Sequence, residues 1–183
     1  MRITKSDITH ALLVGIASFC VAIALTGTLN RLAFGISQVV SMLVLAAVLL
    51  TGIVFDMIGV AAASADEAVF HSLASKKLKG AKRSVWLCRN RAKVASFCND
   101  FVGDLCGTIA GAVGTVVAFR VGAVWGVNLM PVAIATVAGV TIAGKALAKS
   151  YGISKANEIT RLAGIALEWA ASLVGLEGGN DRR

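Results

Sequence analysis

Carboxylates within apolar stretches are the residues of this sequence whose chemistry is most informative. Asp56 interrupts one apolar stretch, and Asp100 and Asp104 open another. In a helix that turns by about 100° per residue, Asp56 and Glu67 share one face, and Asp100 and Asp104 share a face of the other stretch. Because a charge inside a membrane is costly, carboxylates kept there indicate a function.

Carboxylate, hydroxyl and backbone oxygens are the ligands that hard cations such as Mg²⁺ and Ca²⁺ prefer, whereas Zn²⁺ and Cu favour His and Cys. The four cysteines include no Cys-x-x-Cys pair and have no His at zinc spacing. Since Mg²⁺ usually takes one or two carboxylates and keeps several waters, Asp104 with Glu67 or Asp56 would suffice. We expect a divalent-cation site. The alternative is that the carboxylates pair with nearby Lys and Arg, an interpretation that applies to Asp66, Glu67, Asp100, Asp56 and Asp104.

The elements that would position these carboxylates are predicted to be membrane-spanning helices. The chain has 183 residues, of which 57% are apolar and 15% are charged, and its mean hydropathy is +0.79. Soluble domains are about 25% charged. Runs close to the roughly 20 apolar residues that cross a bilayer predict four spans, at residues 11–29, 39–63, 101–119 and 121–143. We expect an all-α integral membrane protein, with residues 1–150 as its transmembrane domain.

The first apolar run has two interpretations. It follows the basic residues Arg2 and Lys5, and Ala22-Ile23-Ala24 is similar to a signal-peptide cleavage site. The run is longer than a usual signal-peptide core, and the rest of the chain is also apolar. These features favour an uncleaved first span.

A basic segment, residues 66–93, separates the second and third runs. Its apolar residues recur at roughly helical spacing, which predicts a cationic amphipathic helix or helix pair on anionic headgroups. Gly80 interrupts the pattern, so a solvated loop is the alternative. The segment holds eight basic residues: Lys76, Lys77, Lys79, Lys82, Arg83, Arg89, Arg91 and Lys93.

The distribution of basic residues predicts the topology. The positive-inside rule places residues 66–93 in the cytoplasm. With four spans, both termini are also cytoplasmic, and only Arg31 and Arg120 among the basic residues fall outside, which favours four spans over three or five. Ser154 is the predicted N-cap of a helix that lies along the inner interface. This helix and the tail that follows it form the predicted C-terminal region, residues 151–183. We expect the protein in a bacterial inner membrane.

Residues from about 39 to 150 resemble the transmembrane domain of the CorB/CorC and cyclin-M-like magnesium transporters. The family's Ser-Ala-x-Glu pattern, its basic amphipathic stretch and the Gly/Asn-rich start of its next span are matched by Ser64-Ala65-Asp66-Glu67, by Lys79 to Asn90, and by Asn99-Asp100 with Gly103-Asp104. The resemblance implies that Ser64, Glu67 and Asn99 lie near a Mg²⁺ site.

The chain also departs from this family. Thr141 stands where the family has a glutamate, and Gly144 stands where it has a proline. The sequence has no match to the family's nucleotide-sensing CBS domains. An extra apolar run precedes the matched region, and Asp56, Asp100 or Asp104 would have to replace the missing carboxylate.

The sequence therefore predicts transport or binding of a divalent cation, with Mg²⁺ as the carried or bound ion. The expected metal ligands are Asp56, Ser64, Glu67, Asn99, Asp100 and Asp104. Neither an organic cofactor nor an enzymatic activity is expected, because no Ser–His–Asp or Cys–His arrangement and no phosphate-binding glycine loop is present.

The expected partners are membrane lipids and a second copy of the chain. Anionic headgroups would bind the basic segment, and nucleic acid is not expected, because the cations flank apolar runs. The GxxxGxxxG series of Gly103, Gly107 and Gly111 predicts close helix packing, which a homodimer could use. The alternative function is a non-transporting membrane scaffold whose basic segment gathers anionic lipids or a partner protein.

Overall fold

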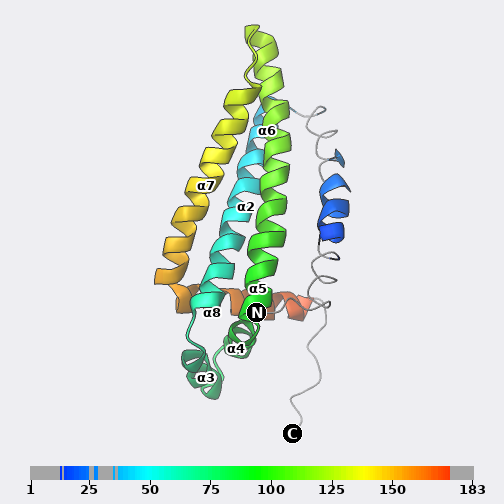
Figure 1. Ribbon diagram of the computed structural model, residues 1–183. Coiled ribbons are helices and arrows are strands. Elements are labelled where there is room, and N and C mark those ends of the chain that lie inside the picture. The colour runs from blue at the N-terminus through cyan, green and yellow to red at the C-terminus, as the bar shows by residue number, and fades with distance from the viewer. Residues whose placement is uncertain (1–12, 14, 25–26, 29–34, 36, 174–183) are drawn as a thin grey trace, which may run out of the picture. The chain divides into compact units, whose positions relative to one another are not determined.

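The computed structural model describes residues 13, 15–24, 27–28, 35 and 37–173, and the elements of this part of the chain are helices with no strand (Figure 1). The prediction of an all-α chain is confirmed for these residues. The chain divides into two compact units. We call Met1–Phe55 with Asn99–Ala146 the apolar unit, and Asp56–Cys98 with Leu147–Arg183 the charged unit.

Among the described residues, three helices are long and apolar enough to cross a membrane: α2 (Gln38–Ser64), the continuous stretch Arg91–Trp125, and α7 (Met130–Ser154). The stretch Arg91–Trp125 comprises α5 (Arg91–Ala95), the π-helix η1 (Ser96–Gly103) and α6 (Asp104–Trp125). These helices support the predicted membrane spans after the first one.

The first predicted span, residues 11–29, lies partly outside the described residues. Its described part contains a short apolar helix, Gly15–Ala24. The basic residues Arg2 and Lys5 and the end of the predicted C-terminal tail, residues 174–183, also lie outside the described part of the chain.

The turn between α6 and α7 lies later than the sequence predicted. We expected a break at Arg120, but α6 continues to Trp125, and Gly126 ends it with a φ of 68° and an N–H that donates to the Gly122 carbonyl. A single charged side chain does not break a helix, whereas a glycine in the left-handed region is a common helix end. Pro131 lies in the first turn of α7, where its missing N–H removes no helical hydrogen bond.

The prediction that Ser154 is an N-cap was wrong. Ser154 is the last residue of α7, and its Oγ donates to the Tyr151 carbonyl at 2.9 Å. The backbone hydrogen bonds continue across the junction to α8 (Ala156–Leu173), from Lys155 N–H to Tyr151 at 2.9 Å and from Ile159 N–H to Lys155 at 3.0 Å. Because these bonds satisfy the backbone, no side-chain cap is needed.

Glycines bring the helices of the apolar unit together, where α2, α6 and α7 lie side by side (Figure 1). A Cβ added to Gly52 of α2 would lie 2.9 Å from Cys106 Cβ of α6, and one added to Gly114 of α6 would lie 2.9 Å from Val137 Cγ2 of α7. In the third pair, α2 with α7, Gly144 of α7 lies against the side chain of Ile53 of α2. Each helix pair therefore packs at a glycine, as is common in membranes.

The glycines that the sequence singled out behave differently. A Cβ added to Gly107 or Gly111 would meet no described atom within 4 Å, apart from the neighbouring backbone of its own helix. Close packing within the apolar unit is therefore carried by Gly52, Gly114 and Gly144. The homodimer through Gly107 and Gly111 stays a prediction.

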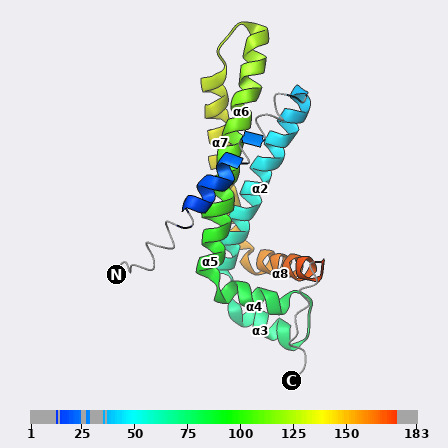
Figure 2. The ribbon, with the colours of Figure 1, turned by 90° about the vertical axis from the view of Figure 1, so that its right-hand side faces the viewer.

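The charged unit has its own small core. Helix α4 (Ala81–Arg89) packs against both α3 (Glu67–Ser75) and α8, and Figure 2 shows α3 beside α4. The buried residues Ala65, Phe70, Cys88 and Ala156 form a cluster in this unit. The basic segment thus contains two helices joined by a largely exposed turn at residues 76–80, and the solvated-loop alternative was wrong for the residues of α3 and α4.

Candidate functional site

A turn of basic residues joins α3 to α4. Lys76 follows the end of α3, Lys77 has a φ of 52°, and Gly80 has a φ of 78° at the N-cap of α4. We call this turn, together with the first turn of α4, the cationic turn. Its exposed basic residues are Lys76, Lys77, Lys79, Lys82 and Arg83. The ion pairs among the described residues include none of these five side chains.

Helix α8 holds the end of the cationic turn in place. The Gly80 N–H donates to a carboxylate oxygen of Glu168, which gives the N-terminus of α4 an acceptor that glycine itself lacks. The Ser84 hydroxyl is buried and lies within hydrogen-bond distance of the carbonyls of Gly80 at 3.0 Å and Thr160 at 3.2 Å. The backbone at Gly80 is therefore fixed from one side while the lysine side chains stay exposed.

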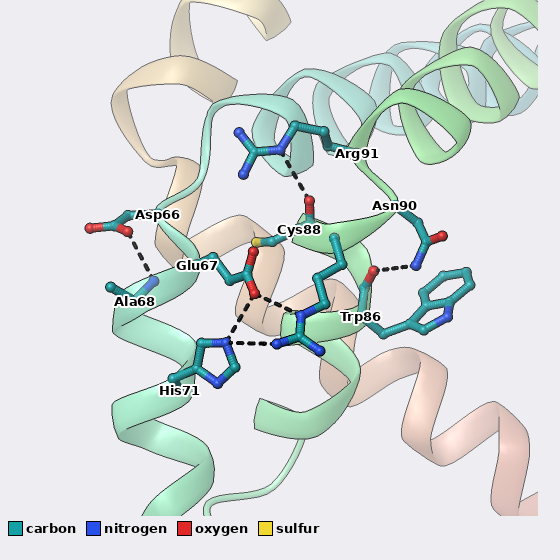
Figure 3. A network of polar contacts seen from close by, with 9 residues as sticks. Asp66, Glu67, Ala68, His71, Trp86, Cys88, Asn90 and Arg91 are labelled. Carbon is teal, nitrogen blue, oxygen red and sulfur yellow. Dashed lines mark hydrogen bonds and ion pairs between the residues drawn. The ribbon is translucent and has the colours of Figure 1, made fainter.

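A second polar network links α3 to the end of α4 (Figure 3). Glu67 Oε1 accepts from Arg89 Nε at 2.8 Å and lies 2.9 Å from His71 Nε2. The hydrogen bond from Arg89, followed by that from His71, lowers the pKa of the Glu67 carboxyl below its ordinary value. Glu67 is thus held as a carboxylate between two donors of the protein.

Neighbouring polar groups hold the start of α3. Asp66 Oδ1 accepts from the Ala68 N–H at 3.0 Å, which is the usual N-cap contact (Figure 3). The Asp66 N–H donates to Asn157 Oδ1 of α8 at 2.9 Å. Cys88 of α4 precedes Arg89 and is fully buried, and burial raises the pKa of its thiol. A thiol with a raised pKa is a weak nucleophile at neutral pH.

The predicted metal ligands in the charged unit have different surroundings. Asp56 lies in α2 and is 2% exposed. Ser64 is exposed as the last residue of α2. Glu67 pairs with Arg89, as the alternative interpretation of this carboxylate predicts.

The predicted ligands in the apolar unit begin in the π-helix. Asn99 and Asp100 both lie in η1, a helix type that is rare and frequent at functional sites. Asn99 Oδ1 is buried and accepts no hydrogen bond from the described residues. Asp104 starts α6 and pairs with Lys145 of α7, with Oδ1 and Nζ 3.3 Å apart. Its carboxylate therefore has a cationic neighbour within the protein.

The acidic residues do not form a ready metal cluster in the described part of the chain. No group of three or more His, Cys, Asp or Glu side chains there could hold a metal ion. Asn99 and Ser64 would add only neutral oxygen ligands. The Mg²⁺ site of the sequence analysis therefore stays a prediction.

Comparisons with protein-family models, curated proteins and solved structures found no match to this chain. The likeness to the CorB/CorC transporters therefore stays an expectation from the sequence.

Sequence reasoning missed the part that α8 plays in the site. Glu168 and Asn157 accept backbone hydrogen bonds from Gly80 and Asp66, which are far away in the sequence. A signal was present, because Gly80 and Gly164 are small residues in otherwise helical patterns. A Cβ at Gly164 would lie 2.7 Å from the Gly80 carbonyl oxygen, so both glycines mark this contact.

Proposed function

We propose that this chain is an integral membrane protein whose charged unit binds anionic phospholipid headgroups through the cationic turn. The observation that carries the proposal is the set of five exposed basic side chains, which form no ion pair with a described residue. Near an anionic membrane surface, each Lys or Arg contributes about 1 kcal/mol of attraction.

The charge of the whole unit supports the same function. Its described residues include eleven basic and five acidic side chains, a net charge of +6 with His neutral. Two of the acidic side chains, Glu67 and Glu158, are already in ion pairs with Arg89 and Lys155. The remaining positive charge is concentrated in the cationic turn. The exposed Trp86 and Trp169 of this unit also suit the headgroup level, where Trp is enriched.

The test is the lipid composition around the protein. The full chain is reconstituted into vesicles of phosphatidylcholine with a minor share of phosphatidylglycerol, and then extracted in polymer-bounded nanodiscs. We expect the ratio of phosphatidylglycerol to phosphatidylcholine in the discs to exceed that of the vesicles. The excess should fall as salt is added, because the Debye length shrinks to about 3 Å at 1 M salt.

Two double variants test whether the enrichment of phosphatidylglycerol depends on the cationic turn or on positive charge anywhere in the protein. Lys76→Gln with Lys77→Gln should reduce the excess of phosphatidylglycerol. The control, Lys149→Gln with Lys155→Gln, removes the same charge from exposed positions outside the turn and should retain most of the excess. Equal enrichment in both double variants and the wild type would contradict the proposal.

A second candidate function is divalent-cation binding or transport. The observation in its favour is Asp56, a carboxylate that is 2% exposed within an apolar helix of spanning length. Ionisable residues buried in such helices often mark ion pathways. Two of the other carboxylates of the expected site, Glu67 and Asp104, are paired with Arg89 and Lys145. These pairs make transport the less supported candidate.

Flux of Mg²⁺, Mn²⁺, Co²⁺ or Ca²⁺ into liposomes that contain the purified chain tests this second function. Asp56→Asn should abolish the flux while the protein still reconstitutes. Glu158→Gln, which changes an exposed carboxylate outside the expected site, serves as the comparison. If no flux is seen under an imposed Na⁺ or proton gradient, the transport candidate is rejected and lipid binding is unaffected.

A further inference from the structure

A groove runs between α3 and α8 within the charged unit. Its volume is about 540 Å³, which falls in the range of about 300 to 1,000 Å³ that is usual for small-ligand sites. We call it the α3–α8 groove. Its apolar lining is formed by Val69, Phe70 and Leu73 of α3 and by Leu162 and Ile165 of α8. An apolar chain is thus the chemistry that this lining would accept.

Three polar residues of α8, Asn157, Glu158 and Arg161, complete the lining. Asn157 already accepts from the Asp66 N–H, and Glu158 Oε1 lies 2.9 Å from Lys155 Nζ. Arg161 is exposed and takes part in no ion pair among the described residues. Its guanidinium group is therefore the polar group of the lining that remains for a ligand, and its planar shape suits a phosphate.

We infer that the α3–α8 groove binds one acyl chain of an anionic phospholipid, with the lipid phosphate at Arg161. This inference rests on the proposed function and adds to it a specific site. The apolar lining would contact the acyl chain, and the cationic residues would face the headgroup. Lys76 supports this arrangement, because it follows Leu73 by three residues and so continues the same side of α3 beyond the groove.

Charge complementarity selects this occupant over a second copy of the chain. The described part of the charged unit carries a net charge of +6. A second charged unit in the groove would bring like charges together, which disfavours association. An anionic phospholipid supplies both the apolar chain and the negative charge.

Native mass spectrometry of the full chain tests the inference. The protein is purified in mild detergent from vesicles that contain phosphatidylglycerol and phosphatidylcholine. We expect one retained phospholipid per chain, with phosphatidylglycerol preferred. Unlike lipid that is gathered by the cationic turn alone, this molecule should survive a high-salt wash, because its acyl chain is bound by apolar contacts.

Two substitutions fill the groove without touching the core. Val69→Trp and Leu162→Trp change side chains that are 38% and 65% exposed, so the larger ring can be accommodated at the surface. Each should lower the retained lipid by roughly tenfold or more. The matched control is Leu167→Trp, which changes a 42% exposed residue of α8 outside the groove. Arg161→Gln should keep the lipid but remove the preference for phosphatidylglycerol.

The outcomes distinguish this inference from the proposed function. If both groove variants retain lipid like the wild type, the groove assignment is overturned, and the nanodisc enrichment still decides the proposed function. If the groove variants dissociate a dimer and leave the bound lipid unchanged, the occupant is a second copy and the inference is overturned. If the nanodiscs show no enrichment of phosphatidylglycerol, but the chain retains one lipid that the groove variants lose, only the proposed function is overturned.

Discussion

The two units of this chain use polar side chains in different ways. In the apolar unit, hydroxyl groups mostly donate to carbonyls of their own helix, as Thr51 does to Ala47 at 2.8 Å and Thr141 does to Val137 at 2.7 Å. In the charged unit, several polar side chains join different helices, as in the contact of Ser84 with the Thr160 carbonyl, although other hydroxyls, such as that of Ser172, donate within their own helix. The first pattern suits helices surrounded by lipid, and the second suits a small domain with a polar surface.

Close approach of helices also differs between the units. Gly52 of the apolar unit lies against a side chain, Cys106, whereas Gly164 of the charged unit lies against the backbone of Gly80 and Ser84. Because a Cβ is fixed to the backbone, helices must separate to relieve either contact, but an added Cβ would meet three atoms within 3.0 Å at Gly164 and only one at Gly52. We therefore expect the charged unit to tolerate a larger residue at its glycine contact less well than the apolar unit does.

The largest expected effect is that of Gly164→Val. An added Cβ would lie 2.7 Å from the Gly80 carbonyl oxygen and 3.0 Å from the Ser84 nitrogen. Overpacking of this kind costs about 3 kcal/mol or more of stability. A large decrease in the thermal unfolding midpoint of the detergent-solubilised protein, and faster proteolysis within residues 66–93, would show it. Gly139→Val, where a Cβ meets nothing within 4 Å, is the control.

A smaller effect is expected for Gly52→Val in the apolar unit. The added Cβ would lie 2.9 Å from Cys106 Cβ, and separating α2 from α6 to relieve this contact should cost about 1 to 3 kcal/mol. Gly111→Val is the matched control, since a Cβ there meets no described atom within 4 Å. The unfolding midpoint in detergent measures both variants. An equal loss for Gly111→Val would instead indicate that its face is covered, as in the predicted homodimer.

The helical architecture was largely predictable from the sequence. Apolar runs identify the helices of spanning length, because few soluble proteins contain such runs. Their ends were less predictable. The two apolar runs predict a break at Arg120, which lies between them, but the turn forms at Gly126, where the backbone adopts a positive φ. Ser154 resembles an N-cap by residue type, yet the backbone hydrogen bonds continue past it.

The contacts of the candidate site could not be predicted in the same way. Periodicity shows which face of a helix is apolar, but it does not show which helix covers that face. The contact between Gly80 and Glu168 joins residues that are distant in the sequence, so no local pattern contains it. The sequence predicts that Glu67 pairs with a nearby Lys or Arg, as one alternative, but it does not identify Arg89 as the partner. For Asp104, the sequence did not identify Lys145 as its neighbour.

A moderate effect is expected for Ser84→Ala, which tests whether a cross-helix hydrogen bond stabilises the charged unit. Ser84 is fully buried, and its hydroxyl contacts the carbonyls of Gly80 and Thr160. Its loss should cost about 1 kcal/mol. Ser172→Ala removes an exposed hydroxyl that donates only within its own helix, to Trp169 at 2.7 Å, and should leave the unfolding midpoint unchanged. Similar midpoints for the two variants would weaken the contrast between the units.

The smallest effect is expected for Glu67→Gln, because the Glu67 pair with Arg89 is largely exposed and solvent screens it. Above the ordinary pKa of glutamate, the variant should unfold at a slightly lower temperature than the wild type. The measurement is the difference between the two midpoints as a function of pH. Arg89→Gln in the same series removes the main cause of the shifted pKa.

The direction of this pH dependence follows from the lowered pKa of Glu67. In the folded protein, hydrogen bonds from Arg89 and then His71 favour the carboxylate, so the folded state loses its proton at a lower pH than the unfolded state does. The stabilisation is therefore complete above the unfolded pKa and is lost as the pH falls through the folded pKa. The midpoints of wild type and Glu67→Gln should converge in acid. In the Arg89→Gln variant, adding Glu67→Gln should change the unfolding midpoint little at any pH. If the midpoints of the wild type and Glu67→Gln instead differ by the same amount at every pH, the charge of the carboxylate is not what stabilises the pair.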